Sequence, residues 1–425
     1  MTALRSPLQA QVVQWLVAPG DPVRAGDVVV ILEAMKMEHE VRAPSEGRVK
    51  ERLFAEGETV GWDEVLLVLE AGAPTPALPQ GGRTEDMGTD AASAVPPSPS
   101  GGGPGRGHAR PDLQRVLDRH ALTLDAARPD AVARRHALGL RTARENISDL
   151  CDPGTFDEYG ALAVAAQSSR RSEEDLQRNT PADGMVTGIG SINGRLFPPE
   201  RARAAVLAYD ATVLAGTQGF RNHQKSDRLL AVALRNRLPV VLFAEGGGGR
   251  PGDVDMPIVA GLHVPTFASF AALNGQVPVV GIAAGRCFAG NAALLGCCDV
   301  IIATRASNIG MGGPAMIEGG GLGVHGPEEI GPAPVQHANG VIDVLVDDEA
   351  QAVAAAKQYL AYFQGAVDGF EAPDALKLRD VVSENRLRVY DSRAALHGIA
   401  DLESVLELRT GFGAGIHTAL ARIGG

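Results

Sequence analysis

The sequence of 425 residues predicts a multi-domain protein, in which a flexible linker joins a small all-β sandwich to an α/β domain. Three observations lead to this fold class. Residues 6–33 repeat in residues 43–70, residues 71–110 are dominated by Pro, Gly, Ser and Ala, and the later sequence alternates short apolar runs with longer amphipathic ones. The predicted divisions of the chain are residues 1–70, 71–110, 111–365 and 366–425.

The N-terminal repeat aligns without a gap at an offset of 37 residues (43 minus 6). Nine aligned positions are identical, among them Gly20 and Gly57. Each copy has the pattern of a strand, a Gly-containing turn and a second strand. Two such copies predict a β-sandwich with approximate two-fold symmetry, and the residues between them, 34–40, should form an exposed hairpin.

A single lysine stands within this hairpin, in the sequence E-A-M-K-M from Glu33 to Met37. Side chains alternate between the faces of a strand, so Met35 and Met37 share one side while Lys36 projects from the other. A lone amine on a rigid turn suits a modifying enzyme, and flexible Met side chains offer that enzyme an adaptable apolar surface. The competing interpretation is an ordinary surface lysine; the position midway between the repeats favours modification.

Residues 71–110 show no apolar periodicity. Such a segment cannot bury enough apolar surface to offset the entropy that it loses on ordering. We therefore expect a linker that lets the N-terminal domain move relative to the rest of the chain.

The α/β domain is expected to begin with a helix-rich stretch, residues 111–180, followed by a hairpin at 182–195. After this hairpin, short apolar runs and amphipathic stretches alternate. The predicted strands are 203–216, 239–244, 278–283, 299–304 and 341–346. Helices are predicted at 222–237 and 349–364, and residues 285–296 are predicted to form a Gly-bearing loop followed by a helix. Repeated strand–loop–helix units imply a largely parallel sheet.

Two glycine-bearing segments follow predicted strands, at 245–250 (E-G-G-G-G-R) and at 285–291 (G-R-C-F-A-G-N). A loop without side chains lets backbone N–H groups converge on a ligand oxygen, and such groups can hold the oxyanion of a thioester enolate. The alternative is a flexible turn without a ligand. The first segment is not a phosphate-binding loop, because no G-K-[ST] follows it.

The bulk properties argue against several classes of function. A net charge of −12 argues against nucleic-acid binding. The sequence has no apolar run of 18 residues and no secretory leader pattern, so we expect no membrane span and a cytoplasmic location. The four Cys residues lack the spacing of a zinc site, and no metal is expected.

Residues 5–70 resemble a biotinyl carrier domain, because A-M-K-M is the signature of that family. The resemblance implies a biotinyl/lipoyl-type sandwich with biotin attached covalently to Lys36, flanked by Met35 and Met37, and biotin protein ligase as the modifying partner. The related lipoyl domains usually have D-K-A at this tip, so the Met pair favours biotin. Ala10 is a mild departure, since the family often has Gly there.

Residues 182–365 resemble the N-terminal half of the carboxyltransferase of biotin-dependent acyl-CoA carboxylases, as in single-chain acetyl- or propionyl-CoA-type enzymes. The motifs that carry the resemblance are D-G-M-V-T-G-I-G-S-I-N-G-R, A-Y-D-A-T-V-L-A-G, E-G-G-G-G-R-P-G-D and G-P-E-E-I-G…H-A-N-G-V-I-D. The resemblance implies a crotonase-like (ClpP/crotonase) fold. It also implies transfer of CO2 from biotin to the enolate of an acyl-CoA thioester, in fatty acid metabolism.

The same resemblance assigns roles to individual residues. One oxyanion donor falls at Gly290, and the other falls at Gly248 or Gly249. Lys225 is expected to contact the coenzyme A phosphates. The alternatives are tight turns without a ligand for the glycines and a solvated helix face for the lysine.

Crotonase hydratases use two catalytic glutamates, and an ungapped match places Ala293 and Gly313 at those positions. Neither residue can transfer a proton, so hydratase activity is not expected. A carboxyltransferase of this family has no such requirement, because the ureido nitrogen of biotin can accept the α-proton.

Residues 366–425 resemble the opening of the C-terminal carboxyltransferase half, and residues 417–425 should form a strand whose partners lie outside this chain. We expect biotin carboxylase and the remaining half as partners, an oligomer, and a chain that accepts biotin without carboxylating acyl-CoA alone. The alternatives are a biotinylated carrier or scaffold subunit and a biotin-dependent decarboxylase or transcarboxylase. The identity of the acyl group stays open.

Overall fold

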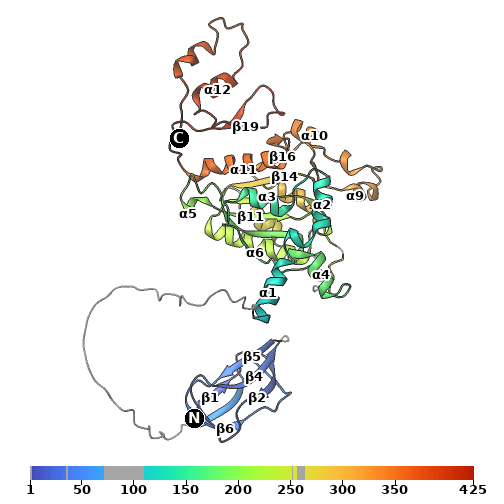
Figure 1. The fold of residues 1–425 in the computed structure, drawn as a ribbon, viewed down its shortest axis with the longest axis vertical. Coiled ribbons are helices and arrows are strands. Elements are labelled where there is room, and N and C mark those ends of the chain that lie inside the picture. The colour runs from blue at the N-terminus through green and yellow to red at the C-terminus, as the bar shows by residue number, and fades with distance from the viewer. Residues whose placement is uncertain (1, 35–36, 71–109, 251, 256–263) are drawn as a thin grey trace, which may run out of the picture. The chain divides into compact units, whose positions relative to one another are not determined.

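The computed structural model describes residues 2–34, 37–70, 110–250, 252–255 and 264–425 (Figure 1). The chain forms two compact units, residues 1–103 and residues 104–425. The predicted linker, residues 71–110, lies almost entirely outside the described residues.

The N-terminal unit is a sandwich of two four-stranded sheets. The first sheet has the order β1 (Thr2–Arg5), β8 (Val65–Glu70), β6 (Gly47–Arg52), β3 (Pro22–Val23). The second sheet has the order β5 (Met37–Arg42), β4 (Val28–Ala34), β2 (Ala10–Trp15), β7 (Thr59–Val60). The inner faces bury a shared apolar core that includes Val12, Leu32 and Leu66.

The sequence repeat corresponds to a structural two-fold in this unit. The Gly20 N–H donates to the Val49 carbonyl at 2.7 Å. Thirty-seven residues further on, the Gly57 N–H donates to the Val12 carbonyl at the same distance. Because each donor lies in one copy and its acceptor in the other, each copy holds the turn of its partner. The predicted two-fold sandwich is therefore confirmed.

The second unit begins with helices, as predicted: α1 (Pro111–Ala121), α2 (Pro129–Ala137), α3 (Ala143–Leu150) and α4 (Glu173–Asn179). Local sequence explains where α3 begins. The Thr142 side chain accepts from the Glu145 N–H, and the Glu145 carboxylate accepts from the Thr142 N–H. This reciprocal capping satisfies donors that an isolated helix end would leave unpaired.

A seven-stranded sheet forms the centre of the second unit. Its order is β18 (Val344–Val346), β16 (Val300–Thr304), β14 (Val279–Ala283), β12 (Val240–Phe243), β11 (Arg203–Tyr209), β10 (Met185–Ser191), β9 (Asp157–Glu158). Within this sheet β11, β12, β14, β16 and β18 run parallel to one another. Strand β10 pairs antiparallel with both of its neighbours, β9 and β11. The sequence 182–195 supplies one strand, β10, rather than a complete hairpin, and its partner is β11.

Helices cover both faces of this sheet (Figure 1). Leu207 and Leu242 face the core with α6 (Phe220–Asn236), α7 (Thr266–Ala271) and α8 (Gly290–Leu295). The adjacent Val206 and Val241 face the opposite core with α3 and α11 (Glu349–Gln364). Because neighbouring strand residues are buried on opposite faces, the strands appear in the sequence as continuous apolar runs.

A second, smaller parallel sheet lies beyond the carboxyl ends of the central strands. Its order is β13 (Gly246–Gly247), β15 (Arg286–Phe288), β17 (Asn308–Gly310). Each of these strands follows β12, β14 or β16 in the chain, so the small sheet gathers the loops that leave the central sheet. The remaining helices are α5 (Pro199–Ala202), α9 (Pro314–Gly319), α10 (Ala333–Ala338) and α12 (Arg393–Ile399).

The C-terminal strand β20 (Thr418–Leu420) pairs antiparallel with β19 (Leu406–Leu408). The expectation that residues 417–425 lack a strand partner in this chain was therefore wrong, because two three-residue strands close in sequence pair with each other. In the part of the chain that the structure describes, no helix is both long and apolar enough to cross a membrane.

Candidate active site

The small parallel sheet brings the two glycine-bearing segments side by side. Gly246 pairs with Cys287, and Gly247 pairs with Phe288. Gly249 and Gly290 each lie two residues beyond the last pair, at the carboxyl ends of adjacent parallel strands. We call residues 246–249 the first glycine loop and residues 289–290 the second glycine turn. The sequence predicted both segments, and the structure brings their backbones side by side.

The first glycine loop has one packed half and one open half. A Cβ atom on Gly246 would lie 2.4 Å from the Ala215 carbonyl oxygen, and one on Gly247 would lie 2.2 Å from that of Phe288. At Gly248 and Gly249 a Cβ atom would meet no atom of the described residues within 4 Å. The loop is thus held by backbone packing at its start, while its end borders free space that a ligand can enter.

The second glycine turn contains a strained residue. Ala289 has φ 51° and ψ −121°, a conformation that residues with a Cβ rarely adopt. Its N–H donates to the Gly310 carbonyl at 3.0 Å, which holds this residue against β17. The chain then turns into α8 at Gly290. Sequence reasoning missed Ala289, because alanine gives no signal of positive φ.

Gln218 lies between the two glycine segments and was also missed. Its backbone N–H donates to the Gly248 carbonyl at 2.9 Å, and its side-chain amide donates to the Tyr209 hydroxyl at 3.1 Å. A Cβ atom on Gly290 would lie only 2.2 Å from Gln218 Oε1. Gln218 therefore contacts both glycine segments at once.

Arg250 directly follows the first glycine loop and anchors it. The guanidinium is 5% exposed and donates to the Thr217 carbonyl at 2.8 Å and to the carboxylate of Asp183. Asp253 lies 3.6 Å away. Burial raises the pKa of Asp183, and the charge of Arg250 opposes that rise. A buried arginine shared by two carboxylates holds the loop against the segment that precedes α6.

The same two carboxylates bind the first turn of α6. Asp253 accepts from the Phe220 N–H at 2.9 Å, and Asp183 accepts from the Asn222 N–H at 2.7 Å. Helix, loop and arginine consequently form one network. Negative groups at the first turn of a helix are also favoured by its dipole.

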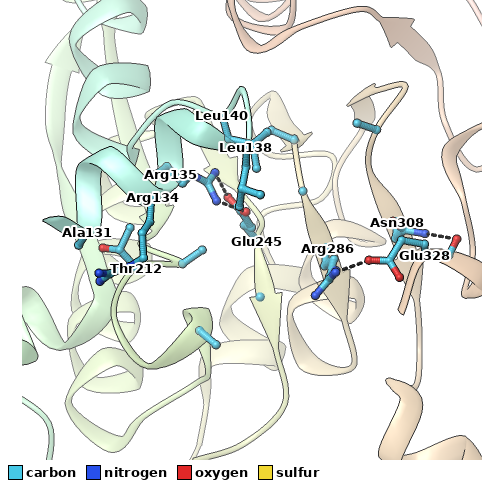
Figure 2. A pocket seen from close by; sticks show the side chains of 16 residues that line it. Ala131, Arg134, Arg135, Leu138, Leu140, Thr212, Glu245, Arg286, Asn308 and Glu328 are labelled. Carbon is cyan, nitrogen blue, oxygen red and sulfur yellow. Dashed lines mark hydrogen bonds and ion pairs between the residues drawn. The ribbon is translucent and has the colours of Figure 1, made fainter. Parts of the chain in front are cut away.

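A cavity of about 570 Å³ adjoins the first glycine loop (Figure 2). Its wall comes from α2 and the residues after it, and the remaining lining comes from the ends of the central strands. The lining includes Arg134, Leu138, Leu140, Thr212, Gly246, Gly285, Arg286, Asn308 and Glu328.

Four charged side chains of this cavity form two pairs. Arg135 donates to both carboxylate oxygens of Glu245 at 2.5 Å, as Figure 2 shows. Burial raises the pKa of Glu245, and the hydrogen bonds from Arg135 oppose this rise. Arg286 pairs with Glu328 on the other side of the cavity. Glu245 immediately precedes the first glycine loop, so its bidentate pair fixes the end of β12.

Lys225 lies in α6, as predicted, and its Nζ donates to the Ala182 carbonyl at 2.9 Å and to the Met185 carbonyl. Burial lowers its pKa to about 8. Lys225 does not line the cavity described above. Its contact with coenzyme A phosphates stays a prediction.

The predicted biotin hairpin is formed by β4 and β5. These strands pair as far as Ala34 and Met37. Met35 and Lys36 lie outside the described residues, so the attachment at Lys36 and the flanking roles of Met35 and Met37 stay predictions. A paired, two-stranded support on both sides of residues 35–36 fits a lysine that is presented to another protein.

In the described part of the chain, His, Cys, Asp and Glu side chains form no group of three that could hold a metal ion. Ala293 lies in α8 and Gly313 directly precedes α9. Thus the two positions expected to hold glutamates in a hydratase are in structured parts of this site, and neither carries an acid.

A two-fold sandwich that carries a hairpin, and two neighbouring glycine segments at the carboxyl ends of parallel strands, are the features expected from the resemblance to biotin-dependent carboxyltransferases. Residues 134–425 match the family model described as "Carboxyl transferase domain", and the chain belongs to that family. Residues 2–69 match the model described as "Biotin-requiring enzyme", whose members carry biotin covalently on a lysine. The expected biotin cofactor and crotonase-like fold are confirmed.

The similar proteins include carboxyltransferase subunits and whole carboxylases. The methylmalonyl-CoA carboxyltransferase 12S subunit of Propionibacterium freudenreichii subsp. shermanii is 30% identical over 303 residues, which cover 69% of this chain and 56% of that protein. The biotin-dependent long chain acyl-coenzyme A carboxylase beta4 subunit of Mycobacterium tuberculosis is 27% identical, covering 74% and 59%. This chain thus spans little more than half the length of these curated relatives.

Solved structures agree with these relatives. A single-chain, multi-domain long-chain acyl-CoA carboxylase is 53% identical, with a TM-score of 0.71 over 99% of this chain and 38% of that chain. The transcarboxylase 12S hexamer with hydrolysed methylmalonyl-coenzyme A bound is 26% identical, with a TM-score of 0.61 over 73% and 61%.

Proposed function

We propose that this chain carries CO2 on biotin at Lys36 and transfers it to the enolate of an acyl-CoA thioester. The observation that carries the proposal is that the first glycine loop and the second glycine turn lie side by side at the carboxyl ends of the paired strands β13 and β15. A cavity of about 570 Å³ borders Gly246, at the start of the first loop. In this proposal the thioester oxygen lies against the end of the first glycine loop and the second glycine turn, beyond the part of the loop that lines the cavity.

The protein's chemical contribution is stabilisation of negative charge. The N–H groups of Gly290 and of Gly248 or Gly249 donate to the thioester oxygen while charge develops on it, and donors that are already in place strengthen most in the transition state. Biotin, when bound, supplies the carboxyl group. The absence of acids at Ala293 and Gly313 fits a reaction in which these positions transfer no proton.

The acyl group is proposed to be a long chain. The support is the 53% identity to a long-chain acyl-CoA carboxylase, which covers nearly the whole of this chain. Titration with acetyl-, propionyl- and palmitoyl-CoA tests this proposal, and tighter binding of acetyl-CoA than of palmitoyl-CoA would count against it.

The partners proposed for the complete enzyme are biotin protein ligase, a biotin carboxylase and the remaining carboxyltransferase half. We also propose an oligomer, which the hexameric 12S relative supports, and a cytoplasmic location, which the four free cysteines fit. Carboxyl transfer between two acyl groups is the second candidate function, because a methylmalonyl-CoA carboxyltransferase subunit is among the relatives.

Two measurements on the full chain test the proposed function. After treatment with biotin protein ligase, streptavidin should detect the wild type and the control Lys50→Arg but not Lys36→Arg, because arginine cannot form the amide. Titration calorimetry should show that the chain binds acyl-CoA. A streptavidin signal that survives Lys36→Arg would refute the attachment site.

A further inference from the structure

Asn291 lies where three segments of the candidate active site meet. It is the second residue of α8 and is fully buried. Its Nδ2 atom donates to the Glu245 carbonyl at 2.7 Å and to the Gly216 carbonyl at 3.1 Å. Glu245 immediately precedes the first glycine loop, and Asn291 immediately follows the second glycine turn. One side-chain amide therefore links the two glycine segments.

The chemistry of this link requires an amide. Two carbonyl oxygens from different segments need two hydrogens, and the Asn NH2 group carries both on one nitrogen. A carboxylate of the same shape has only acceptors, and serine has a single donor. No isosteric replacement among the ordinary residues keeps both bonds.

The two backbone segments whose carbonyls Asn291 binds, at Gly216 and at the start of the first glycine loop, have no side chain between them. A Cβ atom on Gly216 would lie 2.6 Å from the Glu245 carbonyl oxygen, and one on Gly246 would lie 2.6 Å from the Gly216 carbonyl oxygen. Because the backbones touch directly, a side chain can bind both carbonyls only from a third element. Asn291 does so from α8, the helix that starts at Gly290.

The second polar atom of Asn291 supports this interpretation. Its Oδ1 is buried and has no hydrogen-bond partner in the described part of the chain. Leaving a buried acceptor unpaired destabilises the folded state. An apolar side chain would avoid this penalty, so the two donated bonds account for an asparagine at this position.

We propose that Asn291 is a positioning residue, which holds the second glycine turn and the first glycine loop at the separation that lets both N–H groups reach one thioester oxygen. This inference rests on the proposed function. Asn291 acts through the backbone and does not touch the substrate. Replacing it should therefore reduce the polarisation of the thioester carbonyl and leave the affinity for acyl-CoA nearly unchanged.

The test uses palmitoyl-CoA labelled with 13C at the thioester carbonyl, bound to the full chain. Donors on the carbonyl oxygen move its 13C resonance downfield from the free value. The Asn291→Ala chain should bind this thioester with nearly the wild-type affinity and should lose most of that shift. In a completed enzyme kcat should fall about 10²-fold while KM changes little, because small misplacements of a catalytic group carry penalties of that size.

Gln364 offers a matched control. Its Nε2 also donates to two carbonyls, those of Ile192 at 2.9 Å and Arg201 at 3.2 Å, and it is buried at the far end of α11. The Gln364→Ala chain loses the same kind of paired hydrogen bonds, but outside the glycine segments. It should keep the full carbonyl shift even where its melting temperature falls as far as that of Asn291→Ala.

The outcomes separate this inference from the proposed function. A folded Asn291→Ala chain with the full shift would overturn the inference and leave the proposed function intact. Should that chain fail to fold, Asn291→Ser, which retains one donor, is predicted to show a reduced shift, and an undiminished shift would overturn the inference. A wild-type chain that binds palmitoyl-CoA without any shift would contradict the proposed function, and the inference would fall with it.

Discussion

The two glycine segments have the same proposed task but differ in construction. Among the residues that the structure describes, the end of the first glycine loop is open, since a Cβ atom at Gly248 or Gly249 would meet none of their atoms within 4 Å. The second glycine turn is closed, because a Cβ atom on Gly290 would overlap Gln218 Oε1. Glycine is thus needed at Gly290 for packing within the protein, whereas at Gly249 it leaves room for a ligand.

The largest effect is expected at the closed segment. In Gly290→Ala the new methyl group must displace Gln218 or Gly290, and loss of one oxyanion donor typically lowers the rate about 10²–10³-fold. The rate of carboxyl transfer in a completed enzyme measures this effect. The double variant Gly290→Ala with Gln218→Ala removes the overlapping atom and should recover part of the activity. No recovery would show that this overlap is not the cause.

The second largest effect is expected at Arg250, which anchors the first glycine loop. Arg250→Met leaves Asp183 buried without its cation, and breaking a buried ion pair on one side destabilises a protein by about 3 kcal/mol or more. Urea unfolding followed by circular dichroism measures this loss. Arg286→Met is the control, because its pair with Glu328 is exposed and should contribute little. Equal losses in both variants would contradict the anchoring role.

A smaller effect is expected at the open segment. Gly249→Val places its side chain in free space, so the free energy of unfolding should change by less than about 0.5 kcal/mol. The side chain occupies room meant for the ligand, and acyl-CoA binding should weaken by about tenfold, or 1.4 kcal/mol. Titration calorimetry compares this chain with Gly415→Val, a control for adding valine at an open glycine without a positive φ, away from the cavity lining. Wild-type affinity in Gly249→Val would show that the ligand does not lie there.

The smallest effect is expected in the pH dependence of stability and arises from His223 in α6, the helix to which the first glycine loop is anchored. Burial, and secondarily the charge of Arg250, lowers the pKa of His223 to about 4, and His223 Nδ1 lies 2.9 Å from the Thr266 hydroxyl. The unfolded chain takes up this proton near pH 6.5. The free energy of unfolding should therefore fall as pH drops from about 6.5 to about 4. His223→Gln should flatten this slope in urea titrations; an unchanged slope would assign it elsewhere.

The sequence predicted what short-range patterns encode. The repeat located the sandwich, and glycines after apolar runs located both glycine segments at the ends of parallel strands. Ala289, Gln218 and Asn291 could not be found in this way, because their roles depend on contacts with residues far away in the chain. The prediction for residues 417–425 was wrong although the strand partner is nearby in the sequence. That partner, β19, has only three residues and therefore gives little strand signal.

The central claim is that both glycine segments bind the oxygen of one thioester. The most direct measurement is NMR of the full chain labelled with 15N-glycine, titrated with palmitoyl-CoA and, as the control, with coenzyme A. The account predicts that the amide signals of Gly290 and of Gly248 or Gly249 move downfield with the thioester and stay in place with coenzyme A. Movement of only one segment, or equal movement with both ligands, would contradict a shared oxyanion hole.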